Sequence, residues 1–207
     1  MTVKALIFDL GGVVLESPFF VIKLFARESH IDPNQLVRIL NYSSAESPWA
    51  KLERGEITRE AFGEAIEAEA KGEGLSFSGV GILEAFDKHI TVRNQALEAI
   101  RKYRAQGFKV AALTNIWPTN DTLHVAFDML VSEFDVFVES WRVGARKPEL
   151  PIYERVLAEL QVEPTACIFL DDLGENLKPA RAMGMRTIKV SDIDESLEEL
   201  QNLLMKL

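Results

Sequence analysis

The segment ALIFDLGGV, residues 5–13, combines the features of a buried strand with those of a binding site. Its first four residues form an uninterrupted apolar run, the pattern of a strand covered on both faces of a parallel sheet. Asp9 follows directly, and Gly11 and Gly12 come next. Because ligands of open parallel sheets bind beyond the carboxyl ends of the strands, we expect Asp9 to lie at a binding site.

Four further apolar runs of the same kind occur later in the chain, at residues 110–113, 136–138, 166–170 and 187–190. Segments between them, such as 95–104 and 151–160, place their apolar residues on one helical face. Strands that alternate with helices indicate an α/β fold with a doubly wound parallel sheet.

The first two runs are separated by far more chain than one crossover helix needs. This part holds helical patterns at 19–27, 33–40, 59–70 and 80–86, with turn signals at Ser47-Pro48, Gly55 and residues 72–74. We therefore predict a small all-helical cap, residues 16–92, inserted into a core of residues 1–15 and 93–207. A last helix at 196–207 is expected to pack on the sheet.

Composition excludes several classes of protein. The 207 residues correspond to about 1.4 average domains. Their net charge of −9 argues against binding to nucleic acid. We find neither an apolar run long enough to span a membrane nor a signal-peptide pattern, and therefore expect a cytoplasmic protein without a membrane partner. Cys167, the single cysteine, lies in the run ACIFL and is expected to be a buried apolar residue.

Polar residues follow the other predicted strands too. Thr114 and Asn115 follow the second strand, Asp171 and Asp172 follow the fourth, and Lys147 is expected to open the helix after the third. Taken singly, each has an ordinary structural explanation as a turn, a helix cap or a solvated charge. Together they would bring carboxylates, a hydroxyl, an amide and a cation to one edge of the sheet.

These residue types suit phosphate chemistry. Carboxylates ~4 Å apart repel by about 1 to 4 kcal/mol, and a divalent cation would relieve that repulsion. An oxygen-only ligand set favours Mg²⁺. Thr114, Asn115 and Lys147 would supply hydrogen bonds and positive charge to phosphate oxygens, and a carboxylate such as Asp9 can act as a nucleophile. The sequence thus predicts hydrolysis of a phosphate ester.

Four motifs in matching order resemble those of the haloacid dehalogenase-like (HAD) hydrolase superfamily. They are residues 9–13, 111–115, 146–149 and 169–172. Residues 171–181 are most similar to the phosphatase domain of soluble epoxide hydrolases and to a related domain fused to some acyl-CoA dehydrogenases. Glu53 to Ile57 is similar to a segment of small sugar-phosphate phosphatases. The resemblance implies a Rossmann-like core in which the first strand is central, with a helical cap inserted just after it.

The resemblance also implies a role for each motif residue. Asp9 would be the nucleophile and a Mg²⁺ ligand, and the Gly11 carbonyl and Asp172 would be further Mg²⁺ ligands, with Asp171 and Asn176 as supporting groups. Thr114 and Asn115 would bind the phosphate. Lys147 would orient Asp9 and neutralise the phosphoryl charge.

Gly11 departs from the family pattern, because phosphatases of this family usually have there a second Asp that protonates the leaving group. Loss of a general acid costs about 10²- to 10⁴-fold, so we expect a slow phosphatase that favours good leaving groups, such as acyl phosphates or a sugar 1-phosphate. One alternative is a catalytically weak domain that binds a phosphorylated metabolite or a protein. Another is a haloacid dehalogenase, whose halide leaves unprotonated. The retained acidic pair argues against it, because dehalogenases work without Mg²⁺.

Selection of the substrate would fall to the cap. The expected substrate is a small phosphorylated metabolite, bound by a monomer or homodimer. Glu16 and Trp49 are our candidates for cap residues that face the site, and Trp117 and Trp141 could frame the cleft or cover a partner. Candidates for an apolar pocket, of which we expect most to be core, are Phe19, Phe20, Phe25, Trp49 and Phe62.

Overall fold

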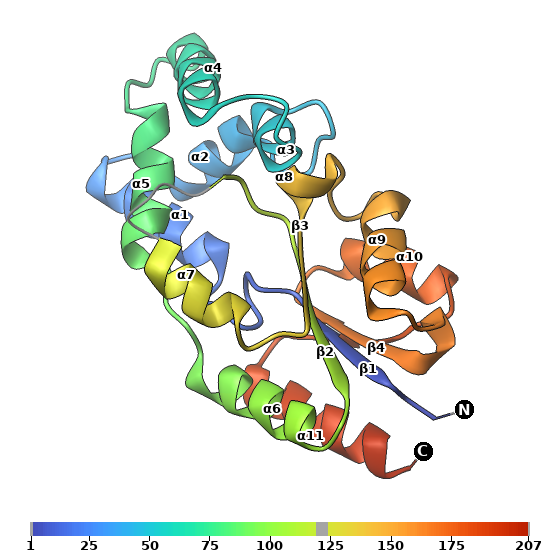
Figure 1. Ribbon diagram of the computed structural model, residues 1–207. Helices are drawn as coiled ribbons and strands as arrows, with labels where there is room; N and C mark the ends of the chain where they lie inside the picture. The colour runs from blue at the N-terminus through green and yellow to red at the C-terminus, as the bar shows by residue number, and fades with distance from the viewer. Residues whose placement is uncertain (1, 119–123, 207) are drawn as a thin grey trace.

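The computed structural model describes residues 2–118 and 124–206 and contains a five-stranded parallel sheet (Figure 1). The strand order is β3-β2-β1-β4-β5, so the first strand is central, as predicted. Phe8 of β1 pairs with Ala112 of β2 and with Leu170 of β4. The strands are β1 (Ala5–Phe8), β2 (Lys109–Thr114), β3 (Val136–Glu139), β4 (Cys167–Asp171) and β5 (Arg186–Lys189).

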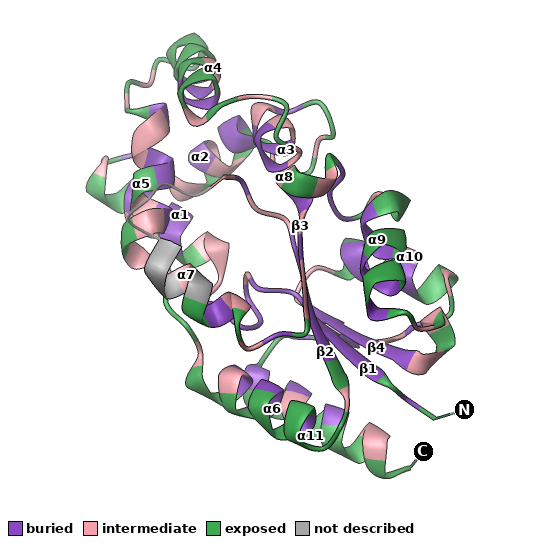
Figure 2. Cartoon of the chain, viewed as in Figure 1, coloured by how far each residue is buried: buried purple, intermediate pink, exposed green. Residues whose placement is uncertain are grey.

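Helices cover both faces of the sheet, which explains why the strands are apolar without alternation. Leu6 and Phe8 belong to a hydrophobic cluster shared with α6 and α11, whereas Ala5 and Ile7 belong to the cluster on the other face, shared with α9 and α10. Strands β1 and β4 are buried along their length (Figure 2), and Cys167 at the start of β4 is buried as expected. The core helices are α6 (Asn94–Ala105), α7 (His124–Val131), α8 (Ser140–Val143), α9 (Leu150–Leu160), α10 (Gly174–Ala182) and α11 (Ile193–Met205), with a 3₁₀ turn η1 (Pro164–Ala166).

Six helices lie between β1 and β2, and we call the first five the helical lobe: α1 (Pro18–Glu28), α2 (Pro33–Leu40), α3 (Pro48–Glu53), α4 (Arg59–Gly72) and α5 (Gly79–His89). In the described residues 9–108, strand pairing is limited to isolated bridges at Gly11, Leu15 and Val92. The lobe has its own hydrophobic cluster, which includes Leu36, Phe62 and Leu83. The exact boundaries of cap and core, 15/16 and 92/93, stay a prediction.

Some local expectations were wrong. Ser47-Pro48 begins α3 rather than a turn, because the Ser47 hydroxyl accepts the Ala50 N–H at 3.1 Å and proline suits the first helical position. Lys147 does not open a helix. It lies between α8 and α9, where Pro148 disfavours helical geometry in the residue before it.

The last helix was predicted correctly in kind. It starts earlier than expected, at Ile193, where the Asp192 side chain caps it. Residue 207 of the predicted range lies outside the described residues. No helix among the described residues is long and apolar enough to cross a membrane.

Candidate active site

The carboxyl ends of three neighbouring strands bring the predicted site residues together. Asp9 follows β1, Thr114 ends β2, and Asp171 ends β4 with Asp172 directly after it. The Asp9 N–H donates to the carbonyl of Leu170 at 2.9 Å, which extends the pairing of β1 with β4 by one residue. The first and fourth strands are adjacent, and the acidic residues that follow them meet at one edge of the sheet.

Lys147 lies at the centre of this group. Its Nζ is 2.7 Å from Asp9 Oδ1 and 2.7 Å from Asp171 Oδ2, and its side chain is 1% exposed. Burial lowers the pKa of Lys147, but the charges of Asp171 and Asp9 outweigh burial, so the pKa is raised overall. The structure thus holds a permanent positive charge against the predicted nucleophile.

Both oxygens of Asp171 are engaged by neighbouring donors. Oδ1 accepts the Leu173 N–H at 2.8 Å and the Asn176 amide at 3.0 Å, and Oδ2 accepts from Lys147. Asn176 is itself 3% exposed. These contacts fix Lys147 and leave Asp171 little capacity for another ligand, and the supporting roles of Asp171 and Asn176 stay a prediction.

Asp9 and Asp172 keep more capacity for a metal. Oxygens of Asp9, Asp171 and Asp172 lie within 4.8 Å of one another, and Lys147 offers one positive charge against three carboxylates. Burial, with the charges of Asp171 and Asp172, raises the pKa of Asp9, although Lys147 opposes this. Burial and the charge of Asp171 raise the pKa of Asp172 to about 6. Such an uncompensated, oxygen-only set fits a hard divalent cation.

Two glycines of the first motif are held by close contacts. Gly12 has φ +75°, and a Cβ there would lie 2.3 Å from Asp172 Oδ2, so this turn requires glycine on two counts. At Gly11, a Cβ would lie 2.9 Å from Pro18 Cγ. The place of a side chain at position 11 is thus taken by Pro18, the first residue of α1.

Asn115 departs from the expected arrangement. Its side chain accepts the Lys147 N–H at 2.7 Å and donates to the Lys147 carbonyl at 3.0 Å. The amide is therefore occupied in holding the Lys147 backbone. Thr114 is 3% exposed and lines the cavity beside Asp9. A role of either residue in binding phosphate stays a prediction.

A cavity of about 160 Å³ lies between the strand ends and the helical lobe. Trp49, Phe86 and Trp117 form its aromatic wall, with ring centroids 5.2 to 5.8 Å apart. Trp117 comes from the segment after β2 but packs into the hydrophobic cluster of the lobe. Further aromatic residues that line the cavity are Phe19, Tyr42 and Phe127.

The candidates from the cap had mixed outcomes. Trp49 lines the cavity, whereas Glu16 is 43% exposed and pairs with Arg93 at 3.2 Å. Phe20 is 55% exposed, and Phe25 and Phe62 belong to the hydrophobic cluster of the lobe. Arg93, which also donates to the Gly12 carbonyl at 2.9 Å, was missed because nothing in its sequence neighbourhood points to the site.

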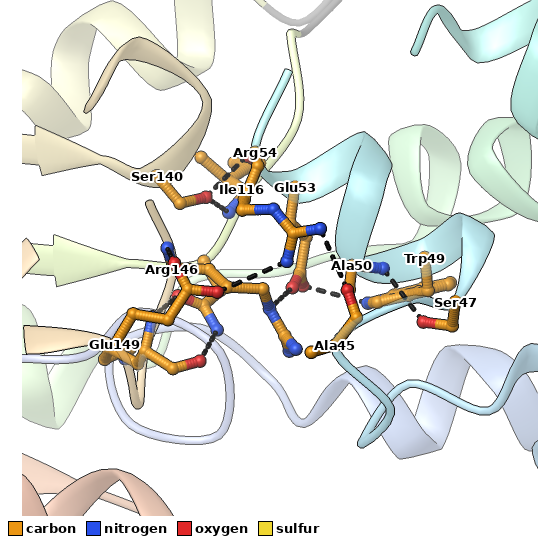
Figure 3. Close-up of polar contacts among 12 residues, drawn as sticks. Ala45, Ser47, Trp49, Ala50, Glu53, Arg54, Ile116, Ser140, Arg146 and Glu149 are labelled. Carbon is orange, nitrogen blue, oxygen red and sulfur yellow. Dashed lines mark hydrogen bonds and ion pairs between the residues drawn. The ribbon is translucent and has the colours of Figure 1, made fainter. Parts of the chain in front are cut away.

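The sequence also gave no indication of a buried ion pair at the cavity (Figure 3). Glu53 Oε2 of α3 lies 2.6 Å from Arg146 Nε, and both side chains are less than a tenth exposed. Trp49 donates its indole N–H to Glu53 Oε1 at 2.9 Å. Burial raises the pKa of Glu53, and the charge of Arg146 opposes that shift.

Several curated proteins resemble the chain over almost its whole length. It is 35% identical over 208 residues to mouse Acyl-CoA dehydrogenase family member 10, covering 97% of this chain and 19% of that protein. It is 33% identical over 214 residues to rat Bifunctional epoxide hydrolase 2, covering 97% of this chain and 39% of that protein. The chain therefore spans only a fifth to two fifths of the length of these two relatives.

A relative of similar length is the sesquiterpene phosphatase of Aspergillus oryzae, 29% identical, with 98% of this chain and 97% of the relative covered. Among solved structures, a HAD family enzyme of Bacteroides thetaiotaomicron, in complex with magnesium and inorganic phosphate, has the same fold. Its TM-score is 0.63 at 23% identity, over 90% of this chain and 93% of that one.

Residues 3–184 match the haloacid dehalogenase-like hydrolases as a family. This range contains all four motifs, which the fold brings together at the carboxyl ends of the strands. The chain therefore belongs to the haloacid dehalogenase-like hydrolase family.

Proposed function

We propose that this hydrolase is a Mg²⁺-dependent phosphatase of small phosphomonoesters, with Asp9 as the nucleophile. The observation that carries the proposal is the position of Lys147, which is 2.7 Å from both Asp9 and Asp171 within a cluster of three carboxylates. A phosphatase among the relatives and a structural neighbour bound to magnesium and phosphate support the same reading.

The metal would be held by Asp9, Asp172 and the carbonyl of Gly11. When bound, Mg²⁺ supplies positive charge to the phosphoryl oxygens and to the crowded carboxylates. Its presence would also favour the ionised form of Asp9 that nucleophilic attack requires.

In the first step, a carboxylate oxygen of Asp9 attacks phosphorus, and the bond from phosphorus to the ester oxygen breaks. The electron pair of that bond stays on the leaving oxygen, which takes a proton from water. Lys147 neutralises charge on the phosphoryl oxygens, and Thr114 donates a hydrogen bond to them. In the second step, water attacks phosphorus of the aspartyl-phosphate, which releases inorganic phosphate and regenerates Asp9.

The cavity defines the group attached to the phosphate. Six aromatic side chains line it, so the alcohol portion of the substrate would be largely apolar. Gly11 and Pro18 leave no acid at the position that the family uses to protonate the leaving oxygen. We therefore expect faster turnover with good leaving groups.

A panel of phosphomonoesters with graded apolar groups and graded leaving-group pKa tests the proposal, with phosphate release measured in Mg²⁺ and in EDTA. Release should require Mg²⁺ and disappear in Asp9→Asn. Release that survives this substitution would contradict the proposal. Binding without release would instead support a phosphometabolite-binding domain, and halide release from a 2-haloacid without Mg²⁺ would support a dehalogenase.

A further inference from the structure

The end of α3 contacts the chain on both sides of Lys147. Glu53 pairs with Arg146, the residue before Lys147, at 2.6 Å, and Arg54 Nη1 pairs with Glu149 Oε1 at 3.2 Å. Gly55 follows with φ +70°, and a Cβ there would lie 3.0 Å from the carbonyl of Trp141 in α8. Two consecutive lobe residues, Glu53 and Arg54, therefore pair with the segment that carries the lysine, and the next residue lies close to α8, which precedes that segment.

These contacts are joined to one another and largely buried, with Glu149 the most exposed of the four side chains at 36% (Figure 3). Glu53 and Arg146 side chains are 7% and 9% exposed, and that of Arg54 is 10% exposed. Glu149 links the two pairs, because its Oε2 accepts the Arg146 N–H at 3.1 Å while Oε1 receives Arg54. Arg54 is held in turn by the Ala45 carbonyl at 2.8 Å.

Lys147 itself sits in a segment without helix or strand, residues 144–149. On the core side its backbone is held by the two hydrogen bonds to Asn115. The side chains of Arg146 and Glu149 are held from outside the segment by Glu53 and Arg54, which form the described ion pairs with them. Without the Glu53 carboxylate, the buried guanidinium of Arg146 would have to regain hydration, so the segment would shift when Glu53 is removed.

From this geometry we propose that Glu53 and Arg54 are positioning residues, which couple the helical lobe to Lys147 and hold its ammonium in register with Asp9. The functional part of this inference rests on the phosphatase activity proposed above. Neither residue needs to touch the phosphoryl group for this role.

Glu53→Gln tests the proposal because it removes the charge and keeps the shape of the side chain. The matched control is Arg59→Gln, which breaks another ion pair of the lobe, the part-buried pair Arg59–Asp87 at 2.6 Å, far from Lys147 in the chain. In Glu53→Gln, hydrogen–deuterium exchange of the peptide covering residues 144–149 should rise above that of the control. Unchanged exchange there would overturn the proposal whether or not the protein is a phosphatase.

The second readout is kinetic. A displacement of about 1 Å can cost on the order of 10²-fold, so Glu53→Gln should lower kcat by about 10- to 100-fold with little change in KM. In a Lys147→Ala background the same substitution should have no further effect, because its effect passes through Lys147. An undiminished loss in that background, or a loss equal to that of Arg59→Gln, would refute the positioning role.

Two outcomes separate this inference from the proposed function. If the wild type releases no phosphate but exchange at 144–149 still rises in Glu53→Gln, the phosphatase proposal fails and the coupling of lobe and lysine stands. Should Glu53→Gln not fold, as judged by circular dichroism, Arg54→Gln carries both readouts, since it removes the contact to Glu149 in the segment that carries Lys147. The other partners of Arg54, Glu56 and the Ala45 carbonyl, lie on the lobe side.

Discussion

The two sides of the cavity are built in different ways. The strand-end side is polar and fixed by short hydrogen bonds, with Lys147, Asp9 and Asp171 joined at 2.7 Å. The lobe side is made of aromatic rings in edge-to-face contact, such as Trp49 and Trp117. Charged groups at fixed distances are what a reaction needs, and apolar rings are what selects a ligand by shape. The difference suggests that changes to the charged groups around Lys147 alter kcat and changes to the aromatic rings alter KM.

The largest effect is expected for Lys147→Met on the strand-end side. Removing the charge that we propose to stabilise the phosphoryl group should lower kcat by about 10²- to 10³-fold, as loss of one electrostatic group does in other enzymes. Lys109→Met is the control, because that lysine lies at the start of β2 and donates to the Leu160 carbonyl. Initial-rate kinetics with Mg²⁺ measure both variants, and a kcat for Lys147→Met near that of the control would contradict the comparison.

Asp172→Asn probes the metal site through stability. The folded-state pKa of Asp172 is raised from its usual 3.8 to about 6, so the folded protein binds more protons than the unfolded chain between these values. In EDTA this group therefore makes the wild type lose stability as pH rises from 4 to 6. The difference in melting temperature between Asp172→Asn and the wild type should therefore shift in favour of Asp172→Asn from pH 4 to pH 6 and stay constant above pH 6.

Mg²⁺ should reverse this difference. At pH 7 the ion should raise the melting temperature of the wild type and raise that of Asp172→Asn much less, since a ligand stabilises the state that binds it. Differential scanning fluorimetry with and without Mg²⁺ measures the shift. Equal shifts in the two proteins would show that Asp172 is not a ligand.

A smaller effect is expected on the lobe side from Phe19→Leu. Phe19 lines the cavity and packs edge-on against Tyr42, with ring centroids 5.3 Å apart. Its replacement should raise KM for apolar phosphomonoesters several-fold and leave kcat nearly unchanged. Phe20→Leu is the matched control, since this neighbour on α1 is 55% exposed. A fall in kcat without a change in KM would contradict the proposal that the aromatic rings affect KM and the charged groups around Lys147 affect kcat.

Gly11→Asp is expected to have the least effect on turnover. The new side chain would meet Pro18 at 2.9 Å, so the carboxyl group should not reach the position of a general acid, and kcat should not rise. Combining it with Pro18→Gly frees that space and should speed hydrolysis of esters with poor leaving groups. If the single variant already does so, Pro18 is not the obstacle.

The strand-end side could be predicted from the sequence because its information is local. Apolar runs mark β1, β2 and β4, and a parallel sheet brings the residues that follow them to one edge. Neighbours of Asp9 were thus identified without coordinates. The helix expected at Lys147 was wrong because Pro148 follows it, and the amide of Asn115 is spent on the Lys147 backbone, which spacing alone does not show.

The lobe side could be predicted only as helices. Helical periodicity indicates α1, α2, α4 and α5, but which aromatic rings turn to the cavity depends on how the helices pack. Glu53 and Arg146 are far apart in the chain, and only the tertiary structure shows that they pair. The contact of Gly11 with Pro18 likewise depends on the entry angle of α1.

Trp117 has a consequence for the modularity of the chain. This indole follows the end of β2 by three residues, yet it fills part of the hydrophobic cluster of the helical lobe. The hydrophobic cluster of the lobe is therefore incomplete without Trp117. Residues 18–89 transferred alone into another protein would have a cavity at the position of this indole. An exchange of lobes between relatives that keeps the protein functional would have to include Trp117 together with the helices. The part of the chain to be exchanged is therefore larger than the segment inserted between β1 and α6.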